Sequence, residues 1–402
     1  MKTIALIDTH QGGHHLTYLR FFSKSLLELG YRVMTFCPNP TALHQWISQN
    51  CPSQAELFQS FEVQEPAFKR FPIIRRLSQP LNILTRWRHA AATIQDASVK
   101  TGHPPDLVFF AWIDSYLSHY LTHHIIDRIF PYRWSGIYFQ PPHELRLKQL
   151  STHRAPLNHY AVLQSSRCQG IAVLNEDIAE ALQSKLRNPV ITFPDIADES
   201  PPDLSFSVAQ QIREKASDRK VIGLLGNLSK RKGFLTLLEA AQKAAPEDLF
   251  FVFAGPFSKP SFSPSELAKI QAIIQSAPPN CLFHFEYIPD EPQLNALIQE
   301  CDILFAAYHH FPYSSNTLTK ASVFNKPVIV SAGFCMGARV QRFRLGLSIP
   351  EGNAIQCIEA LHKLCDRSGL ANADLQPDFA GYKQLHSIAQ LKIAFQQLLA
   401  NF

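Results

Sequence analysis

The sequence predicts an α/β protein of two domains, each built on a doubly wound parallel sheet. Short apolar runs of strand length alternate with amphipathic runs of helix length along the chain, which is the pattern of repeated βαβ units. The 402 residues are 46% hydrophobic and 18% charged, so there is enough apolar material for two separate cores. We therefore expect two Rossmann-like domains that face each other across a cleft.

The first βαβ unit opens the chain. Residues 3–7 form an apolar strand, Gly12 and Gly13 break it, residues 16–29 have helical spacing, and residues 31–36 restart a strand. Further strands of the first sheet are expected at residues 107–113, 135–139 and 170–174. Repetition of this unit predicts parallel strands with right-handed crossovers.

The same order of elements starts again after residues 194–207, where prolines, acids and serines crowd together as in a linker. Residues 220–225 form a strand and residues 234–245 an amphipathic helix. Strands should follow at residues 249–254, 282–285, 303–306 and 327–330. The predicted domains are residues 1–195, joined by a C-terminal helix at 383–402, and residues 208–382.

The composition limits which partners the protein can bind and where in the cell it is expected. The net charge of +5 suits anions such as diphosphates or lipid headgroups and does not indicate nucleic acid. Eight cysteines without a Cys-x-x-Cys pair suggest reduced, buried thiols. Neither a signal peptide nor a membrane-spanning apolar stretch is expected, so we predict a cytoplasmic protein whose membrane contact, if any, is peripheral and at the inner face.

A basic turn bounded by glycines lies between a predicted strand and helix, at residues 226–233. Its three cations are Lys230, Arg231 and Lys232. Free N–H groups and partial positive charge at a helix N-terminus attract phosphate. A solvated basic turn is the alternative, but the position after a buried strand favours a phosphate site.

A second polar segment, Ser314, Ser315 and Asn316, precedes a helix that contains Lys320. These side chains are good helix caps. They also offer donors to sugar hydroxyls or phosphate oxygens, and the sequence leaves both roles open.

Several stretches of the C-terminal half match one family in order and spacing over about 150 residues, which is more specific than any single motif. They are residues 226–233, 253–256, 287–290 with Leu294, 301–303, 320–321 and 325–330. This half resembles the retaining family-4 glycosyltransferases of the GT-B fold. The resemblance implies a hexosyltransferase-like enzyme that moves a sugar from a nucleotide-diphosphate donor to an unidentified glycan, lipid-linked or small-molecule acceptor, as in polysaccharide biosynthesis.

The resemblance also implies a donor site. Lys232 matches the lysine that pairs with the diphosphate, Tyr287 and Ile288 match the segment that lines the base, and residues 314–316 match the loop whose amides meet the phosphates. Protein cations and helix amides would stabilise the leaving diphosphate, so neither metal nor cofactor is expected. Adjacent histidine pairs, at 123–124 and 309–310, are poor metal-binding patterns.

Two departures from the family pattern affect this site. Asn227 stands where the family usually has a diphosphate-binding arginine, and Arg231 is the expected substitute. The family's two glutamates fall on Pro312 and Lys320, which leaves open a sugar-nucleotide or glycan-binding protein without transferase activity, or an isomerase resembling sugar-nucleotide 2-epimerases. We expect Lys320 to turn toward the diphosphate; pairing with an acid such as Asp302 is the alternative.

The N-terminal half resembles the family more loosely. Gly12, Gly13 and His14 form a candidate acceptor-side loop, since glycines let a ligand approach the backbone, but a plain turn explains them equally well. His143 follows a predicted strand in a Gln-Pro-Pro-His segment and is a candidate catalytic histidine, with a structural proline turn as the alternative.

Residues 68–94 combine basic and apolar side chains and contain no acidic residue. This pattern suits a membrane surface or a lipid-linked acceptor. The alternative is a core helix with a solvated face, and Pro72 and Pro80 should interrupt any long helix here.

Overall fold

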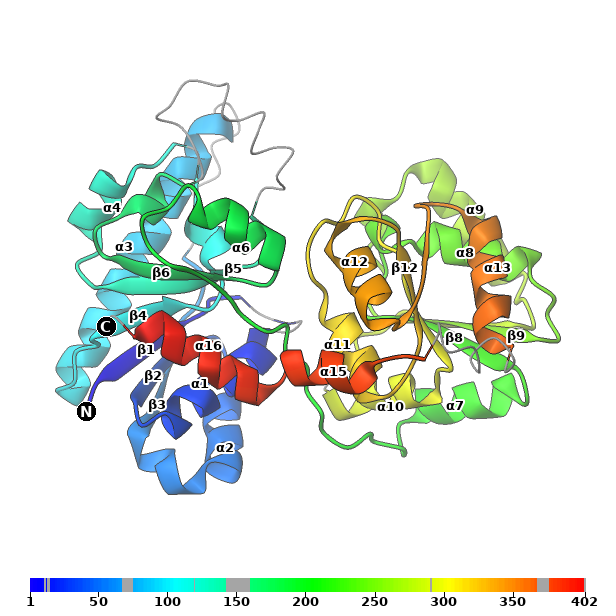
Figure 1. Ribbon diagram of the computed structural model, residues 1–402, viewed down its shortest axis with the longest axis horizontal. Helices are drawn as coiled ribbons and strands as arrows, with labels where there is room; N and C mark the ends of the chain where they lie inside the picture. The colour runs from blue at the N-terminus through cyan, green and yellow to red at the C-terminus, as the bar shows by residue number, and fades with distance from the viewer. Residues whose placement is uncertain are drawn as a thin grey trace. The chain divides into compact units, whose positions relative to one another are not determined.

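A computed structural model of the chain describes residues 1–10, 12, 15–66, 75–118, 120–141, 160–289, 291–366 and 376–400, without the side chains of 75–79. The chain forms two compact units (Figure 1). Unit 1 comprises Met1–Ile196 and Ser387–Phe402, and unit 2 comprises Ala197–His386. Residues 197–207, expected as a linker, thus belong to unit 2, as do the first four residues of the expected C-terminal helix.

Unit 1 is built on a parallel sheet in the order β3-β2-β1-β4-β5-β6-β7. The strands are β1 Thr3–Ile7, β2 Arg32–Cys37, β3 Phe58–Glu62, β4 Leu107–Phe110, β5 Trp134–Tyr138, β6 Cys168–Val173 and β7 Val190–Thr192. From β1 the chain builds outward to β3 and then crosses back to β4. The carboxyl ends of β1 and β4 therefore form a topological switch point, where such sheets bind ligands.

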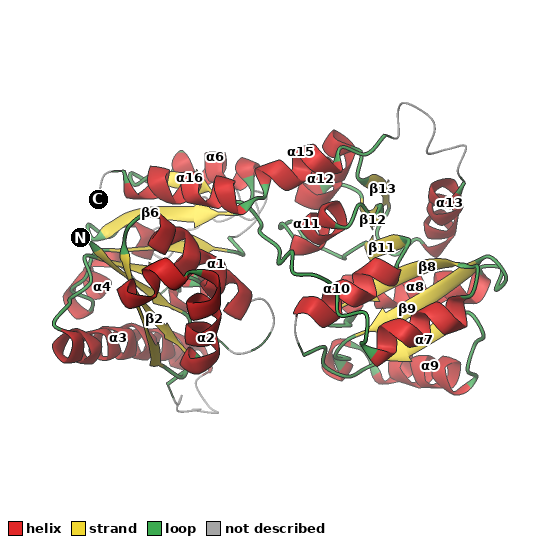
Figure 2. Cartoon of the chain, turned by 90° about the horizontal axis from the view of Figure 1, so that it is seen from below, coloured by secondary structure: helices red, strands yellow, loops and turns green. Residues whose placement is uncertain are grey.

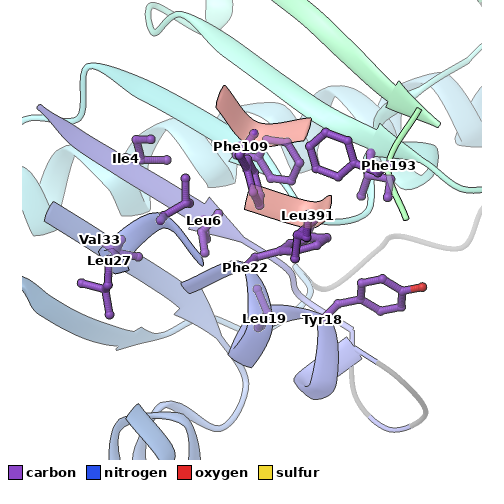
Figure 3. Packing of buried hydrophobic residues seen from close by; sticks show 14 of the residues in the cluster. Ile4, Leu6, Tyr18, Leu19, Phe22, Leu27, Val33, Phe109, Phe193 and Leu391 are labelled. Atoms are coloured by element: carbon purple, nitrogen blue, oxygen red, sulfur yellow. The ribbon is translucent and has the colours of Figure 1, made fainter. Parts of the chain in front are cut away.

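The helices of unit 1 are α1 His15–Glu28, α2 Pro40–Asn50, α3 Arg75–Thr101, α4 His123–Ile129, α6 Glu176–Gln183 and α16 Ile388–Leu399, with short 3-10 turns η1 Pro52–Leu57, η2 Ile113–Tyr116 and η3 Val162–Gln164. The last helix, α16, shares a core with the first, α1 (Figure 3). Phe22 of α1 packs edge-on against Phe109 at 5.6 Å and Phe395 at 5.4 Å between ring centroids. Helices α1 and α16, far apart in the sequence, thus contribute to one hydrophobic core.

Helix α3 contains the described part of the basic segment 68–94. Its burial fits the interpretation of this segment as a core helix with a solvated face. Ile83, Trp87 and Ile94 are buried, so these apolar side chains are not available to a membrane. Arg86 forms an ion pair with Glu65. The helix runs through Pro80, contrary to expectation. One lost backbone hydrogen bond near its start is tolerated because the following turns are anchored in the core.

Unit 2 has a parallel sheet in the order β10-β9-β8-β11-β12-β13. Its strands are β8 Lys220–Leu225, β9 Leu249–Ala254, β10 Cys281–His284, β11 Ile303–Ala306, β12 Val328–Ser331 and β13 Gly346–Ile349. Its helices are α7 Ser207–Ala216, α8 Phe234–Lys243, α9 Pro264–Gln275, α10 Glu291–Glu300, α11 Asn316–Val323, α12 Phe334–Phe343, α13 Ala354–Cys365 and α15 Phe379–Leu385, with turns η4 Lys230–Lys232 and η5 Lys259–Ser261. Helices cover both faces of the sheet, each over its own core (Figure 2).

The predicted fold class is confirmed in both units, because each sheet is wholly parallel and covered by helices. All eight cysteines are free, and six of them are buried. In the part of the chain that the structure describes, no helix is long and apolar enough to cross a membrane.

Candidate functional site

The candidate site of unit 2 lies at the carboxyl ends of β8 and β11, which are neighbours in the sheet. This is the switch point of the second sheet. The loops after the two strands touch, since His309 N donates to Arg231 O at 2.7 Å. Gly233 has φ of 77°, and a Cβ there would lie 2.4 Å from Ala307 O, so only glycine fits. The basic turn is thereby held against the loop that follows β11.

Two of the three cations of the turn have no acidic partner in the part of the chain that the structure describes. Lys230 pairs with Glu266 at 2.6 Å. Among the described residues, no carboxylate pairs with Arg231 or Lys232. They lie over aromatic rings instead: the Arg231 guanidinium is 4.8 Å from the ring centroid of Phe311, and Lys232 Nζ is 5.4 Å from that of Tyr308. The turn thus presents two positive charges that an anion can neutralise.

Tyr308 links these cations to the start of α11. Its hydroxyl lies 3.1 Å from Thr317 Oγ1, and Ser315 caps the helix by accepting from Thr317 N at 3.4 Å. Burial alone would raise the pKa of Tyr308, but the charge of Lys232 and hydrogen bonds from Thr317 and Ser315 outweigh it and hold the pKa below its usual value. The structure therefore brings Ser315 and Lys232 to one place, around a tyrosine that the sequence analysis missed although it follows a predicted strand.

The two neighbours of Ser315 lie at the same helix start. Ser314 Oγ accepts from Arg339 Nη1 of α12 at 2.6 Å, with both residues buried. Asn316 is the first residue of α11. Arg339 was missed because a lone arginine on an amphipathic helix reads as a solvated residue, and only the tertiary structure shows that it is buried.

Lys320 does not turn toward the basic turn, and this corrects the favoured expectation. Its ammonium donates to Asp198 O at 2.9 Å, Glu291 Oε2 at 2.6 Å and Asn295 Oδ1 at 2.6 Å. The side chain is 4% exposed. All three N–H groups are used, so Lys320 has none to offer a diphosphate. The expected alternative partner was also wrong, because Asp302 pairs with Lys220 at 3.1 Å.

The other predicted donor residues are more dispersed. Asn227 is exposed in the turn after β8. Tyr287 follows β10, two strands away, and is 58% exposed, while Ile288 packs against one core of unit 2. Gly12 is exposed, with φ of 78°. The candidates Gly13, His14 and His143 lie outside the described residues.

Unit 1 holds a polar cluster at its own switch point that the sequence analysis did not assemble. Asp8 Oδ1 lies 2.9 Å from His10 Nδ1, and Asp8 Oδ2 lies 2.7 Å from His15 Nδ1. Burial would raise the pKa of Asp8, but the hydrogen bonds from both histidines outweigh it and lower the pKa. The available signal was a charge directly after the first apolar strand.

Comparisons with known proteins show which family unit 2 is similar to. Residues 206–376 match the profile of the family Glycosyl transferases group 1. This region is therefore similar to group 1 glycosyltransferases. No curated protein matches the sequence.

Solved structures share the fold of the whole chain. HepE of Anabaena, in complex with UDP and glucose, has a TM-score of 0.66 at 13% identity, with 100% of both chains covered. Sucrose-phosphate synthase of Thermosynechococcus elongatus has a TM-score of 0.66 at 16% identity, covering 100% of this chain and 99% of that one. WaaG, a glycosyltransferase involved in lipopolysaccharide biosynthesis, has a TM-score of 0.61 at 15% identity, covering 98% and 99%.

The predicted resemblance to GT-B glycosyltransferases is confirmed by the family match and by these folds. The matched region contains the whole basic turn and the start of α11. The site described above therefore lies inside the region that matches this family.

Proposed function

We propose that the protein transfers a sugar from a nucleotide-diphosphate donor to a hydroxyl-bearing acceptor, and that Arg231 and Lys232 hold the donor diphosphate. The observation that carries this proposal is the pair of cations without acidic partners among the described residues, at the switch point of the region that matches this glycosyltransferase family. A diphosphate supplies the missing negative charge. HepE is solved with UDP and with UDP-glucose, so these are the first probes.

The chemistry we propose is electrostatic. When the bond between the sugar carbon and the diphosphate oxygen breaks, the electron pair leaves with the diphosphate and its negative charge grows. Lys232, with Arg231 beside it, stabilises that charge more strongly in the transition state than in the bound donor. These cations take the place of a metal at the leaving group, and retention of configuration is the outcome that the family resemblance favours.

The acceptor class is a wider proposal. A glycan or lipid-linked acceptor is favoured by the similarity to WaaG. The buried apolar face of α3 argues against that helix as the membrane-binding element, so a lipid-linked acceptor would have to be recognised elsewhere. Candidate glycans and lipid-linked sugars should be tried with UDP-glucose as donor.

The first test compares two lysines of the same turn. Lys232→Ala removes an uncompensated charge, whereas Lys230→Ala removes one that Glu266 already neutralises. A hydrogen bond to a charged group is worth about 1.5–3 kcal/mol, so Lys232→Ala should weaken UDP binding by about 10- to 100-fold. Lys230→Ala should change it by less than about threefold. Calorimetry measures both, and wild-type affinity in Lys232→Ala would remove the basis of the proposal.

Binding without transfer is the second candidate, because one specific observation favours it. Lys320, at the position of a family glutamate, belongs to a buried network and does not serve a donor ribose. UDP release and the sugar products should be measured across UDP-, GDP- and ADP-sugars. Lys232-dependent binding with no product from any donor would make this a binding protein, and an isomerised sugar nucleotide would indicate the epimerase-like alternative.

A further inference from the structure

The cluster at the switch point of unit 1 is built by two adjacent strands and the first helix. Asp8 directly follows β1, His10 lies two residues further on, and His15 is the first residue of α1. The loop after β4, the neighbour of β1, adds Trp112 and Ser115. The chain therefore concentrates ligating side chains at the place where a doubly wound sheet takes a ligand.

The side chains are held in one orientation. The rings of His10 and His15 are stacked, with centroids 4.8 Å apart, and Trp112 packs against His15 at 4.6 Å. Both Nδ1 atoms face the Asp8 carboxylate, whose side chain is 1% exposed. One ligand atom from each of the three residues lies within 4.8 Å of the other two.

We propose that Asp8, His10 and His15 bind one divalent transition-metal ion of the zinc type, through the Asp8 carboxylate and the Nδ1 atoms of both histidines. In the ion-free form, the Nδ1–H groups donate to Asp8. When the ion binds, it replaces these protons, and each neutral ring carries its proton on Nε2 instead. His10 Nε2 already lies 2.9 Å from Ser115 Oγ, which then accepts a hydrogen bond from Nε2–H. A partner of this kind on the outer nitrogen is what fixes ligating histidines in metal sites.

The size of the site suits such an ion after a small adjustment. Zinc binds nitrogen at about 2.0–2.1 Å, so two tetrahedral donor atoms are about 3.3 Å apart. Here the carboxylate oxygens lie 2.7 and 2.9 Å from the two Nδ1 atoms, and the widest ligand separation is 4.8 Å. Because the two stacked ring planes are only 18° apart, each ring must rotate slightly to aim its Nδ1 lone pair at a shared ion.

The ligand set determines the class of ion. Two imidazoles and one carboxylate favour zinc, cobalt, nickel or copper over magnesium and calcium, which prefer oxygen ligands. Three protein ligands leave a fourth position for water or for an oxygen of a bound ligand. The ligands of this ion belong to unit 1, whereas Arg231 and Lys232, which we assign to the leaving diphosphate, belong to unit 2.

The experiment measures zinc binding by the full-length protein after chelator treatment and removal of the chelator. One equivalent of zinc should bind by calorimetry and be retained through gel filtration. His15→Gln and His10→Gln should each weaken zinc binding at least about tenfold, as expected for loss of one of three ligands. The double variant His123→Gln/His124→Gln is the matched control: its rings are also adjacent, at 3.9 Å, but they are not part of this carboxylate cluster, and binding should be unchanged.

Tryptophan fluorescence is a second measurement, and it tests where the ion binds. Copper or nickel bound at this site lies near Trp112 and should quench its fluorescence. Trp112→Phe should keep the stoichiometry of one and lose most of the quenching. The near-ultraviolet spectrum of each variant shows whether it is folded. The proposal is overturned if wild type binds no stoichiometric zinc, if folded His15→Gln and His10→Gln bind it as wild type does, or if the control double variant loses it.

Discussion

At the scale of single residues, Lys320 shows most clearly how burial determines what a side chain can bind. In the sequence, a lysine at a ligand-binding position is expected to bind phosphate through its positive charge. Here it is surrounded by the carboxylate of Glu291, the amide oxygen of Asn295 and the carbonyl of Asp198. These acceptors come from two separate segments of unit 2, since Glu291 and Asn295 belong to α10 and Asp198 lies before α7. The lysine therefore joins α11 to both segments.

This network predicts a stability defect and not a donor-binding defect. Lys320→Met leaves the half-buried Glu291 without this cation, and breaking a pair with a buried partner costs about 3–5 kcal/mol. Urea unfolding followed by circular dichroism should show this loss. The double variant Lys320→Met/Glu291→Leu should recover much of it, since replacing a buried pair by apolar groups is often close to neutral.

The control for this change is Lys326→Met, because the Lys326 ammonium donates to the Gln299 carbonyl at 2.9 Å in an exposed hydrogen bond. Its free energy of unfolding should stay within about 0.5 kcal/mol of wild type. UDP affinity should be unchanged in both single variants under conditions where they are folded. A stable Lys320→Met variant with weakened UDP binding would return Lys320 to the diphosphate.

Prediction from sequence was uneven at this scale for a physical reason. The nearness of Arg231, Lys232 and Ser315 could be predicted, because a strand that ends in a glycine-bounded turn fixes where nearby residues must lie. Asp8 and His10 were not combined with His15, since hydrogen bonds between side chains depend on backbone directions that spacing does not reveal. Metal-binding patterns were sought in residues close together in sequence, whereas Asp8, His10 and His15 come together from the loop after β1 and the start of α1.

At the scale of elements, the sequence predicted the central strands well and the edge strands poorly. β1, β8, β9 and β11 have the predicted bounds, because buried parallel strands form continuous apolar runs. β3, β7 and β13 were missed. They lie at sheet edges and their side chains are mostly half-buried, so they carry no apolar run to detect.

The basic turn itself allows a prediction about an element. Gly233→Ala imposes a side chain on a backbone with φ of 77° and places its Cβ 2.4 Å from Ala307 O. Gly102→Ala has nearly the same backbone cost, with φ of 72°, but open space around it. The clash should cost about 1–3 kcal/mol beyond the control in unfolding experiments. It should also weaken UDP binding, because the turn must move away from the loop after β11, and equal stability and affinity in the two variants would contradict this geometry.

At the scale of the whole molecule, the chain begins unit 1, completes unit 2, and returns to unit 1 with α16. Each unit has its own sheet and cores. The two candidate sites are also separate: the diphosphate site lies in unit 2 and the proposed metal site in unit 1. A ligand of one site should therefore stabilise mainly the unit that holds it.

This separation can be measured because all four tryptophans, Trp46, Trp87, Trp112 and Trp134, lie in unit 1. Tryptophan fluorescence thus follows unfolding of unit 1, while circular dichroism follows both units. Phe395 of α16 is buried against the rings of Phe22, Phe109 and Phe193. Phe395→Ala should destabilise unit 1 by about 3–5 kcal/mol, whereas Ile393→Ala, at a position 44% exposed on the same helix, should not.

In Phe395→Ala, the fluorescence transition should move to lower urea than the later part of the circular dichroism transition, although only seven residues follow the altered one in the sequence. Adding UDP at about 100 times its Kd stabilises the binding unit by about 2.7 kcal/mol. In this variant, UDP should shift only the later, fluorescence-silent transition, because its proposed site belongs to unit 2. If UDP instead raises the fluorescence midpoint by the same amount, the units unfold as one cooperative body, and the core completed by α16 is not an independent folding unit.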